Sequence, residues 1–299
     1  DFKALAGYNF ERSVGKITDL LRYGLITSQA ESINLALGEN FTSYSTESRW
    51  RSVGVFARIN YSYDNKYLIE LNGRYDGSSK FPTNQQWGFF PSVSAAWRVS
   101  GERWWNVNPN ILSSLKIRGS WGELGNANVG VYSFIEAFNI DNLSYVIDGV
   151  SKPRITSIPS QIPDGLTWET SRTIDGGIDV GFYNGKINLT ADYYVRNTLD
   201  MYTVGPTLPD TYGASAPKGN YADLVTRGFE LSLSYDDSFK LGAHNLNVGF
   251  KATLADNRSF ITRYNNPTKS LGDYYVGQEI GEIWGYEFGG IFNSQELID

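Results

Sequence analysis

Cysteine is absent from the 299 residues of this sequence, and histidine occurs once, as His244. The first absence excludes disulfides, thiolate zinc sites and cysteine nucleophiles. A lone histidine in a turn-like stretch is weak support for a catalytic dyad or triad. The net charge is −6 and no basic cluster is present along the sequence, so nucleic acid is not an expected partner.

Long hydrophobic runs are also missing, because no apolar stretch reaches the roughly 18 residues of a transmembrane helix. Membrane-spanning strands give a much weaker signal per segment, so the missing helix does not exclude a membrane protein. Charged residues are 19% of the chain, below the usual share of about 25%. Aromatic residues are 15%, with 20 Tyr and 8 Trp.

The stretch from Trp50 to Trp97 shows what the chain does contain. Apolar and polar side chains alternate through three long segments, which a tight turn and a polar loop connect. Successive side chains of a strand point to opposite faces, so this period of two predicts strands with one apolar and one polar face. Their length suits tilted strands that cross a membrane.

The same period predicts about nine strands in the whole chain. They cover residues 2–10, 50–63, 66–76, 87–99, 114–122, 167–182, 186–197, 222–235 and 245–256. Residues 12–48 lose the pattern and are expected to form a long loop with a helical turn near 17–21. Residues 64–65 and the pair Asn184-Gly185 are expected to be tight hairpin turns.

Shorter and longer connections are expected to alternate along the chain. The shorter ones are 64–65, 100–113, 183–185 and 236–244. Aromatic residues gather beside these short connections. Outer-membrane barrels have short periplasmic turns, long extracellular loops and aromatic girdles. The sequence therefore predicts an all-β fold, part of an antiparallel up-and-down transmembrane β-barrel. The alternative is a soluble, secreted β-sandwich that binds carbohydrate and packs its aromatics in a core.

Seven stretches together resemble one family, in order and in spacing. They are GVFARINYSY (54–63), KYLIELNGRYDG (66–77), DGSSKF (76–81), WGFFPSVSAAW (87–97), LKIRGSWGELG (115–125), LTWET (166–170) and WGYEFGGIFNSQELID (284–299). This set is similar to the SusC/RagA family of TonB-dependent outer-membrane transporters, which occurs in Bacteroidetes. The similarity extends over essentially the whole chain.

The resemblance implies a barrel of about 22 strands closed by a plug, located in the outer membrane of a Gram-negative cell. It implies import of oligosaccharides or peptides, a SusD-like lipoprotein partner and energy from the TonB complex through the plug. We expect residues 1–299 to be part of the barrel domain, with the plug domain and the final strands outside this sequence. Lipid of the outer membrane is expected to contact the apolar faces.

Two groups of residues are candidates for contacts. If the apolar faces meet lipid, the polar faces line the lumen, and the lumen-facing candidates are Arg58, Glu70, Arg74, Arg118 and Arg196. Aromatic rings stack on sugars and also suit protein interfaces. The candidates for substrate binding or a partner interface are Tyr274, Tyr275, Trp284, Tyr286 and Phe288.

Catalysis, cofactors and metals are not expected. Carboxylate pairs such as Asp175 and Asp179 could serve a glycoside hydrolase in principle, but both lie on the predicted polar face of one strand. Residues 76–79 lack the ligand count of a calcium site and are predicted to form a turn. A hydrolase is therefore the last of three hypotheses, after the transporter and the soluble binding module.

Overall fold

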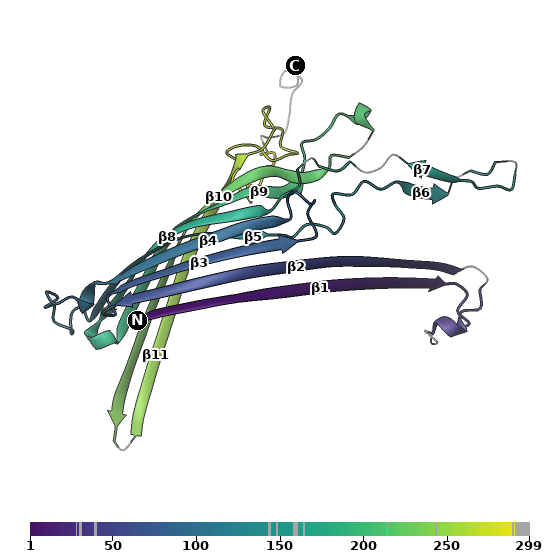
Figure 1. Ribbon diagram of the computed structural model, residues 1–299. Helices are drawn as coiled ribbons and strands as arrows, with labels where there is room; N and C mark the ends of the chain where they lie inside the picture. The colour runs from purple at the N-terminus through teal and green to yellow at the C-terminus, as the bar shows by residue number, and fades with distance from the viewer. Residues whose placement is uncertain are drawn as a thin grey trace.

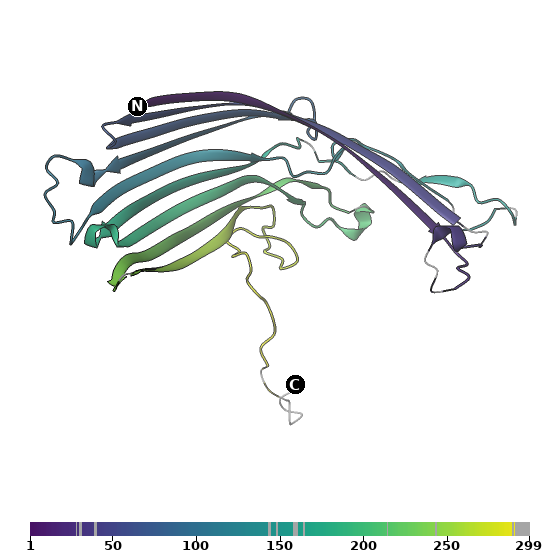
Figure 2. The same ribbon diagram turned by 90° about the horizontal axis from the view of Figure 1, so that it is seen from below.

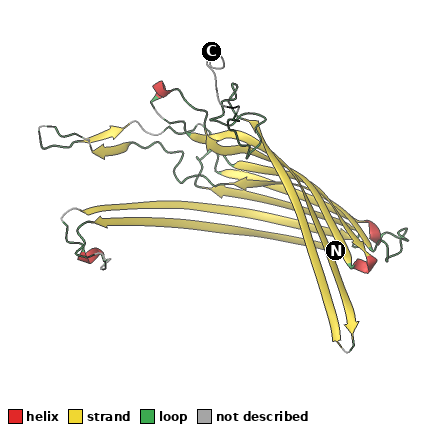
Figure 3. Ribbon diagram, turned by 180° about the vertical axis from the view of Figure 1, so that it is seen from behind, coloured by secondary structure: helices red, strands yellow, loops and turns green. Residues whose placement is uncertain are grey.

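The computed structural model describes residues 1–27, 29, 32–38, 41–142, 145–147, 149–157, 161–163, 165–213, 215–242, 244–288 and 290. Strands dominate this part of the chain, and helical residues are confined to short turns (Figure 3). Those 3₁₀ turns are Ile33–Leu35, Val99–Gly101, Tyr183–Gly185 and Asp210–Tyr212. No helix among the described residues is long and apolar enough to cross a membrane.

One sheet contains nine strands, and each strand pairs antiparallel with its neighbours in chain order (Figure 1). The strands are β1 (Phe2–Arg22), β2 (Phe41–Tyr63), β3 (Tyr67–Ser78), β4 (Trp87–Arg98), β5 (Ser114–Asn126), β8 (Glu169–Phe182), β9 (Ile187–Val204), β10 (Lys218–Leu241) and β11 (His244–Arg263). A separate small ribbon, β6 (Asn139–Asn142) and β7 (Arg154–Ser157), lies in the connection between β5 and β8. The nine predicted strands are confirmed.

The sheet is arched across its strands (Figure 2), as the right-handed twist of neighbouring strands requires. Its first and last strands, β1 and β11, pair with only one strand of the sheet each. The short connections, after β2, β4, β8 and β10, all lie at one end of the arch. We call this the short-turn end, and the opposite end the long-loop end.

The turn after β2 has the geometry that hairpins favour. Asp64 and Asn65 both have positive φ, at 51° and 52°, and the amide of Lys66 donates to the carbonyl of Tyr63 at 2.9 Å. Two consecutive left-handed residues define a type I′ turn, whose twist matches that of the strands. At the second predicted hairpin, Asn184 and Gly185 also have positive φ.

Each successive short turn lies further along the strand direction than the one before it, which gives the tilt of the strands. A row of directly opposite residues runs from Tyr63 across the sheet to Leu231 on β10. The turn after β2 begins at that row, whereas β8 ends four residues past it and β10 ends ten residues past it. Ten residues over six strand spacings correspond to a strand tilt of about 45–50°, close to that of membrane barrels.

The prediction of a long loop over residues 12–48 is wrong for residues 12–22 and 41–48, and the connection is shorter, from residue 23 to residue 40. β1 continues to Arg22 and β2 begins at Phe41, and Ile17 to Leu21, expected to form a helical turn, are strand. Figure 1 shows this two-stranded ribbon passing well beyond the ends of β3, β4 and β5. The apolar and polar alternation is lost here because both faces of the ribbon are exposed, with no layer to select apolar side chains on one of them.

Candidate functional site

The outward face of the sheet is apolar and exposed. Val55, Ile59 and Leu71 are 56%, 40% and 48% exposed, and their rows continue across the sheet through further aliphatic and aromatic side chains. No second sheet covers this face in the described part of the chain. Burial between two sheets is what a sandwich would require, so the β-sandwich alternative does not agree with the fold.

Aromatic rings on the outward face gather at the short-turn end. The rings of Tyr67 and Trp97 are stacked 6.5 Å apart, and Trp104 meets Trp97 edge-on at 6.4 Å. Glu102, in the connection after β4, accepts hydrogen bonds from the Tyr67 hydroxyl at 2.6 Å and from Trp97 Nε1 at 3.0 Å. These hydrogen bonds lower the pKa of Glu102 below its usual range. Rings with an anchored polar edge suit a membrane–water interface.

The apolar belt has the height of a membrane. On β2 it extends from Tyr63 to Val53, and Arg51 is the first charged outward-facing residue past it. The twelve residues from Tyr63 to Arg51 rise about 28 Å at a tilt of about 45°. The lipid-facing band of a membrane barrel is about 25 Å tall. The outward face therefore matches the thickness of the lipid that would cover it.

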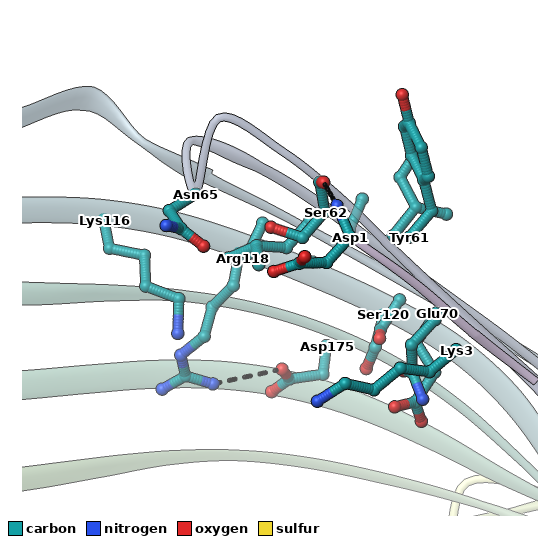
Figure 4. Close-up of a pocket in the computed structure, with 17 residues that line it drawn as sticks. Asp1, Lys3, Tyr61, Ser62, Asn65, Glu70, Lys116, Arg118, Ser120 and Asp175 are labelled. Atoms are coloured by element: carbon teal, nitrogen blue, oxygen red, sulfur yellow. Dashed lines mark hydrogen bonds and ion pairs between the residues drawn. The ribbon is translucent and has the colours of Figure 1, made fainter. Parts of the chain in front are cut away.

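The inward face is polar and surrounds a hollow of about 580 Å³ (Figure 4). Side chains from six neighbouring strands line it, including Lys3, Glu70, Lys116, Arg118 and Asp175. Six strands can line one hollow only because the sheet is concave on this side. In Figure 4, Tyr61, from the outward face, points away from these polar groups.

Arg118 is the centre of an ion-pair network on this face. Its guanidinium lies 2.6 Å from Asp192, 3.4 Å from Asp179 and 3.8 Å from Asp175, and Lys116 adds a contact of 3.5 Å to Asp179. Two cations face three carboxylates, so the network keeps an excess of negative charge. The sequence placed Arg118 and the carboxylates on polar faces, and the strand register brings them together.

The other lumen-facing candidates also lie on the inward face. Arg58 donates to Asn72 at 2.7 Å and lies 3.8 Å from Glu70. Arg74 contacts Asp76 at 2.6 Å, and the Arg196 guanidinium lies 5.4 Å from the ring centre of Tyr194. Arg58, Glu70, Arg74, Arg118 and Arg196 thus share one polar wall. Whether they contact a transported molecule stays a prediction.

Two of the quoted motifs meet at the long-loop end. Phe81, from DGSSKF, is fully buried, and its ring lies 4.9 Å from that of Trp168, from LTWET. Leu166 is 1% exposed in the same cluster, and Trp168 Nε1 donates to the carbonyl of Gln86 at 3.2 Å. This loop core fixes the connections 79–86 and 127–168 to each other. The sequence showed the motifs but not that they contact each other.

The candidate aromatic residues of the last loop fall into two groups. The ring of Tyr274 packs edge-on against Tyr264 at 5.7 Å, and Tyr275 is buried, with its hydroxyl donating to Glu282 at 2.5 Å. Trp284 Nε1 donates to the same carboxylate at 2.9 Å. These two bonds hold the pKa of Glu282 below its usual value, and the bond to Glu282 raises the pKa of Tyr275.

The second group consists of Tyr286 and Phe288, which are among the most exposed side chains of the molecule. The Trp284 ring is also mostly exposed. Trp284, Tyr286 and Phe288 are therefore accessible to a partner or substrate, whereas Tyr274 and Tyr275 mainly support the loop. No contact of any of the five with another molecule has been tested.

The described residues contain no group of three or more His, Asp or Glu side chains that could hold a metal ion. His244 lies at the tip of the β10–β11 hairpin, beside the turn. The arrangement as a whole is that of a wall with one apolar face and one polar face.

Comparison with known proteins agrees with this geometry. The family model described as TonB dependent receptor-like, beta-barrel matches residues 2–292. The chain belongs to this family. The resemblance to SusC/RagA proteins drawn from the sequence motifs is thereby confirmed, together with the all-β, up-and-down fold.

The relatives are receptors. TonB-dependent receptor P26 of Formosa agariphila is 28% identical over 313 residues, covering 99% of this chain and 30% of the relative. TonB-dependent receptor SusC of Bacteroides thetaiotaomicron is 32% identical over 194 residues, 64% of this chain and 19% of the relative. The RagAB peptide importer in its closed-closed state aligns with a TM-score of 0.76 over 89% of this chain and 28% of that chain, at 24% identity. The last match shows a shared fold. The chain thus spans less than a third of these proteins.

Proposed function

We propose that the chain forms part of the barrel wall of an outer-membrane TonB-dependent importer. Its role is to form the wall of the transport channel, rather than to catalyse a reaction. Residues 1–299 are part of the barrel domain, with the plug and the closing strands supplied by the rest of the protein. The short-turn end faces the periplasm and the long-loop end faces outward. Energy reaches the importer from the TonB complex through the plug.

The two-faced wall is the observation that supports this proposal most strongly. Its outward face is an exposed apolar belt of about membrane height, with aromatic rings at its edge. Its inward face carries the Arg118 network and the 580 Å³ hollow. Such a sheet is stable only if lipid covers one face and if further strands pair with the free edges of β1 and β11.

The cargo is an oligosaccharide or a peptide, and a SusD-like lipoprotein is the partner at the long-loop end. The name of the RagAB peptide importer supports the peptide class, and the oligosaccharide class rests on the resemblance to the SusC/RagA family. Trp284, Tyr286 and Phe288 are exposed rings that could stack on a sugar or pack against a lipoprotein. The long-loop end, where the loop core keeps the connections in place, is the surface such a partner would cover.

Uptake in whole cells tests this function. Deletion of the full-length receptor should abolish uptake of its cargo, which labelled oligosaccharide and peptide libraries would identify, and removal of TonB should abolish it equally. The receptor itself should require detergent for extraction and migrate as a heat-modifiable barrel. A receptor that is extracted without detergent, or uptake that persists without TonB, would contradict the proposal.

A further inference from the structure

In the outer part of β1 and β2, residues 12–22 and 41–51, the cations lie on the outward face. Arg12 lies directly opposite Arg51, Val14 opposite Arg49, and Lys16 opposite Glu47. Opposite residues of an antiparallel pair point to the same side, and every second residue shares that side. These side chains therefore continue the face that presents Tyr8 and Phe10. The rows between them, Ser13 opposite Trp50 and Gly15 opposite Ser48, point inward and carry no charge.

This cluster has an excess of positive charge that the described residues do not neutralise. Glu47 contacts both Lys16, at 3.5 Å, and Arg49, and the Lys16 and Arg49 side chains remain 69% and 62% exposed. Arg12 and Arg51 are exposed and make no ion pair with any described residue. Like charges directly opposite each other destabilise a sheet, so an anion from outside the described residues would stabilise this pair.

A second arginine pair lies at the other end of the sheet, where Arg258 also contacts Glu279 at 3.9 Å. Arg227 lies directly opposite Arg258, on the outward face, two residues past Phe229. Arg12 is likewise two residues past Phe10. The strands are tilted, so residues at equal distances from their short turns lie at similar heights in the wall. At roughly 3.3 Å per residue, the heights of the two arginine pairs differ by no more than about 10 Å. Between them the outward face carries Arg172 paired with Glu123 at 2.7 Å, so the cations form two clusters at the upper edge of the apolar belt, one at each end of the sheet. We call these two clusters the collar.

The position of this collar indicates what it binds. Arg51 lies about 28 Å above the lower aromatic rings at a tilt of about 45°, which is the upper limit of the lipid band. Tyr8, Phe10 and Trp87, immediately below, are 81%, 62% and 49% exposed. A lid over the lumen would contact the loops, whereas this face is directed into the plane of the membrane. Lipid head groups are the anions found there.

We propose that Arg12, Arg49 and Arg51, assisted by Lys16 and by the Arg227–Arg258 pair, bind the phosphate groups of a phosphorylated glycolipid in the outer leaflet. The planar guanidinium fork matches phosphate oxygens in a bidentate manner. This inference rests on the proposed location of the barrel in the outer membrane. It adds a lipid site that anchors the exposed ribbon, separate from cargo and lid.

The test uses the full-length receptor purified in detergent, with lipid A as the probe and dephosphorylated lipid A as the comparison. Native mass spectrometry counts the lipid bound to each receptor. The test variant is R12S/R49S/R51S, and the matched control is K3S/R58S/R74S, which removes three cations from the inward face of β1, β2 and β3. Each cation near an anionic membrane surface contributes roughly fivefold in affinity.

The expected result is a loss of lipid A affinity of about a hundredfold in R12S/R49S/R51S, with the control like the unmodified receptor and dephosphorylated lipid A weak in all three. Retention within threefold of the unmodified receptor, or no preference for the phosphorylated form, would overturn the inference. So would loss of the lipoprotein partner from R12S/R49S/R51S with lipid A unchanged. Each receptor is also tested for heat-modifiable migration. If the chain is not part of a membrane barrel, this migration is absent, so failure of the proposed function is distinguished from failure of the lipid site.

Discussion

Replacing Ala57 by arginine tests whether the outward face meets lipid. Ala57 lies six residues from Tyr63 and six from Arg51, which places it at the middle of the apolar belt. It is exposed, opposite Ala6 and Gly73, so Ala57→Arg removes almost no packing. An arginine at the midplane of a membrane barrel costs about 2–4 kcal/mol. We expect this loss in the free energy of unfolding of the full-length receptor.

Asn60→Arg is the matched control on the same strand. Asn60 faces the hollow and lies directly opposite Glu70 on one side and Lys3 on the other, so the new cation stays in water with one carboxylate and one cation beside it. We expect a change within about 0.5 kcal/mol, as for ordinary surface substitutions. Reversible denaturant unfolding in lipid bilayers measures both values. Equal destabilisation by the two substitutions, or a larger effect of Asn60→Arg, would refute the assignment of the faces.

Three further predictions concern the long-loop end. Phe81→Ala removes a fully buried ring from the loop core, and the opening free energy of residues 78–86 should fall by about 3–4 kcal/mol in hydrogen exchange; unchanged protection would contradict the loop core. A Cβ on Gly125 would clash with the Phe90 ring. Gly125→Ala should therefore destabilise the receptor strongly when Phe90 is present, and only weakly when it is added to Phe90→Ala in a double-mutant cycle. Additive effects of the two substitutions would exclude the clash. The pKa of Glu282 is lowered from 4.5 and the pKa of Tyr275 is raised from 10.0. Their contact should therefore be lost only as pH falls below 4.5 or rises above 10.0. The fluorescence difference between the receptor and its Trp284→Phe variant should be constant from pH 5 to 9, and a step near pH 7 would contradict this prediction.

Much of the fold could be predicted because lipid and water select side chains on opposite faces. Along β2, from Val53 to Tyr63, apolar outward residues alternate with inward residues of which Phe56 is the one large apolar side chain. The strand, its faces and the tight turn after it were predicted. Beyond the apolar belt this selection ends. Both faces of the outer ribbon from Ser13 to Arg22 are exposed, and the same strand continues without the pattern that revealed its first half.

Contacts between distant segments could not be predicted from the sequence. Arg118 and Asp192 are 74 positions apart, and their 2.6 Å contact depends on the register of β5, β8 and β9. The sequence shows no basic cluster because the collar takes Arg12 from β1 and Arg51 from β2, on either side of a connection. The motif residues Phe81 and Trp168 were visible as a resemblance, but their role as a loop core needed the structure.

Cysteine scanning of β9 tests the central claim most directly, and the 299 residues contribute no native thiol that would compete for the label. Single cysteines at each position from 187 to 195 of the full-length receptor would carry a spin label, and lipid-soluble oxygen and a water-soluble nickel chelate would report its surroundings. We predict a period of two, with Ile187, Leu189, Ala191, Tyr193 and Val195 accessible to oxygen and the positions between them accessible to the chelate. Uniform access to the chelate, or the opposite phase, would contradict a wall between lipid and water.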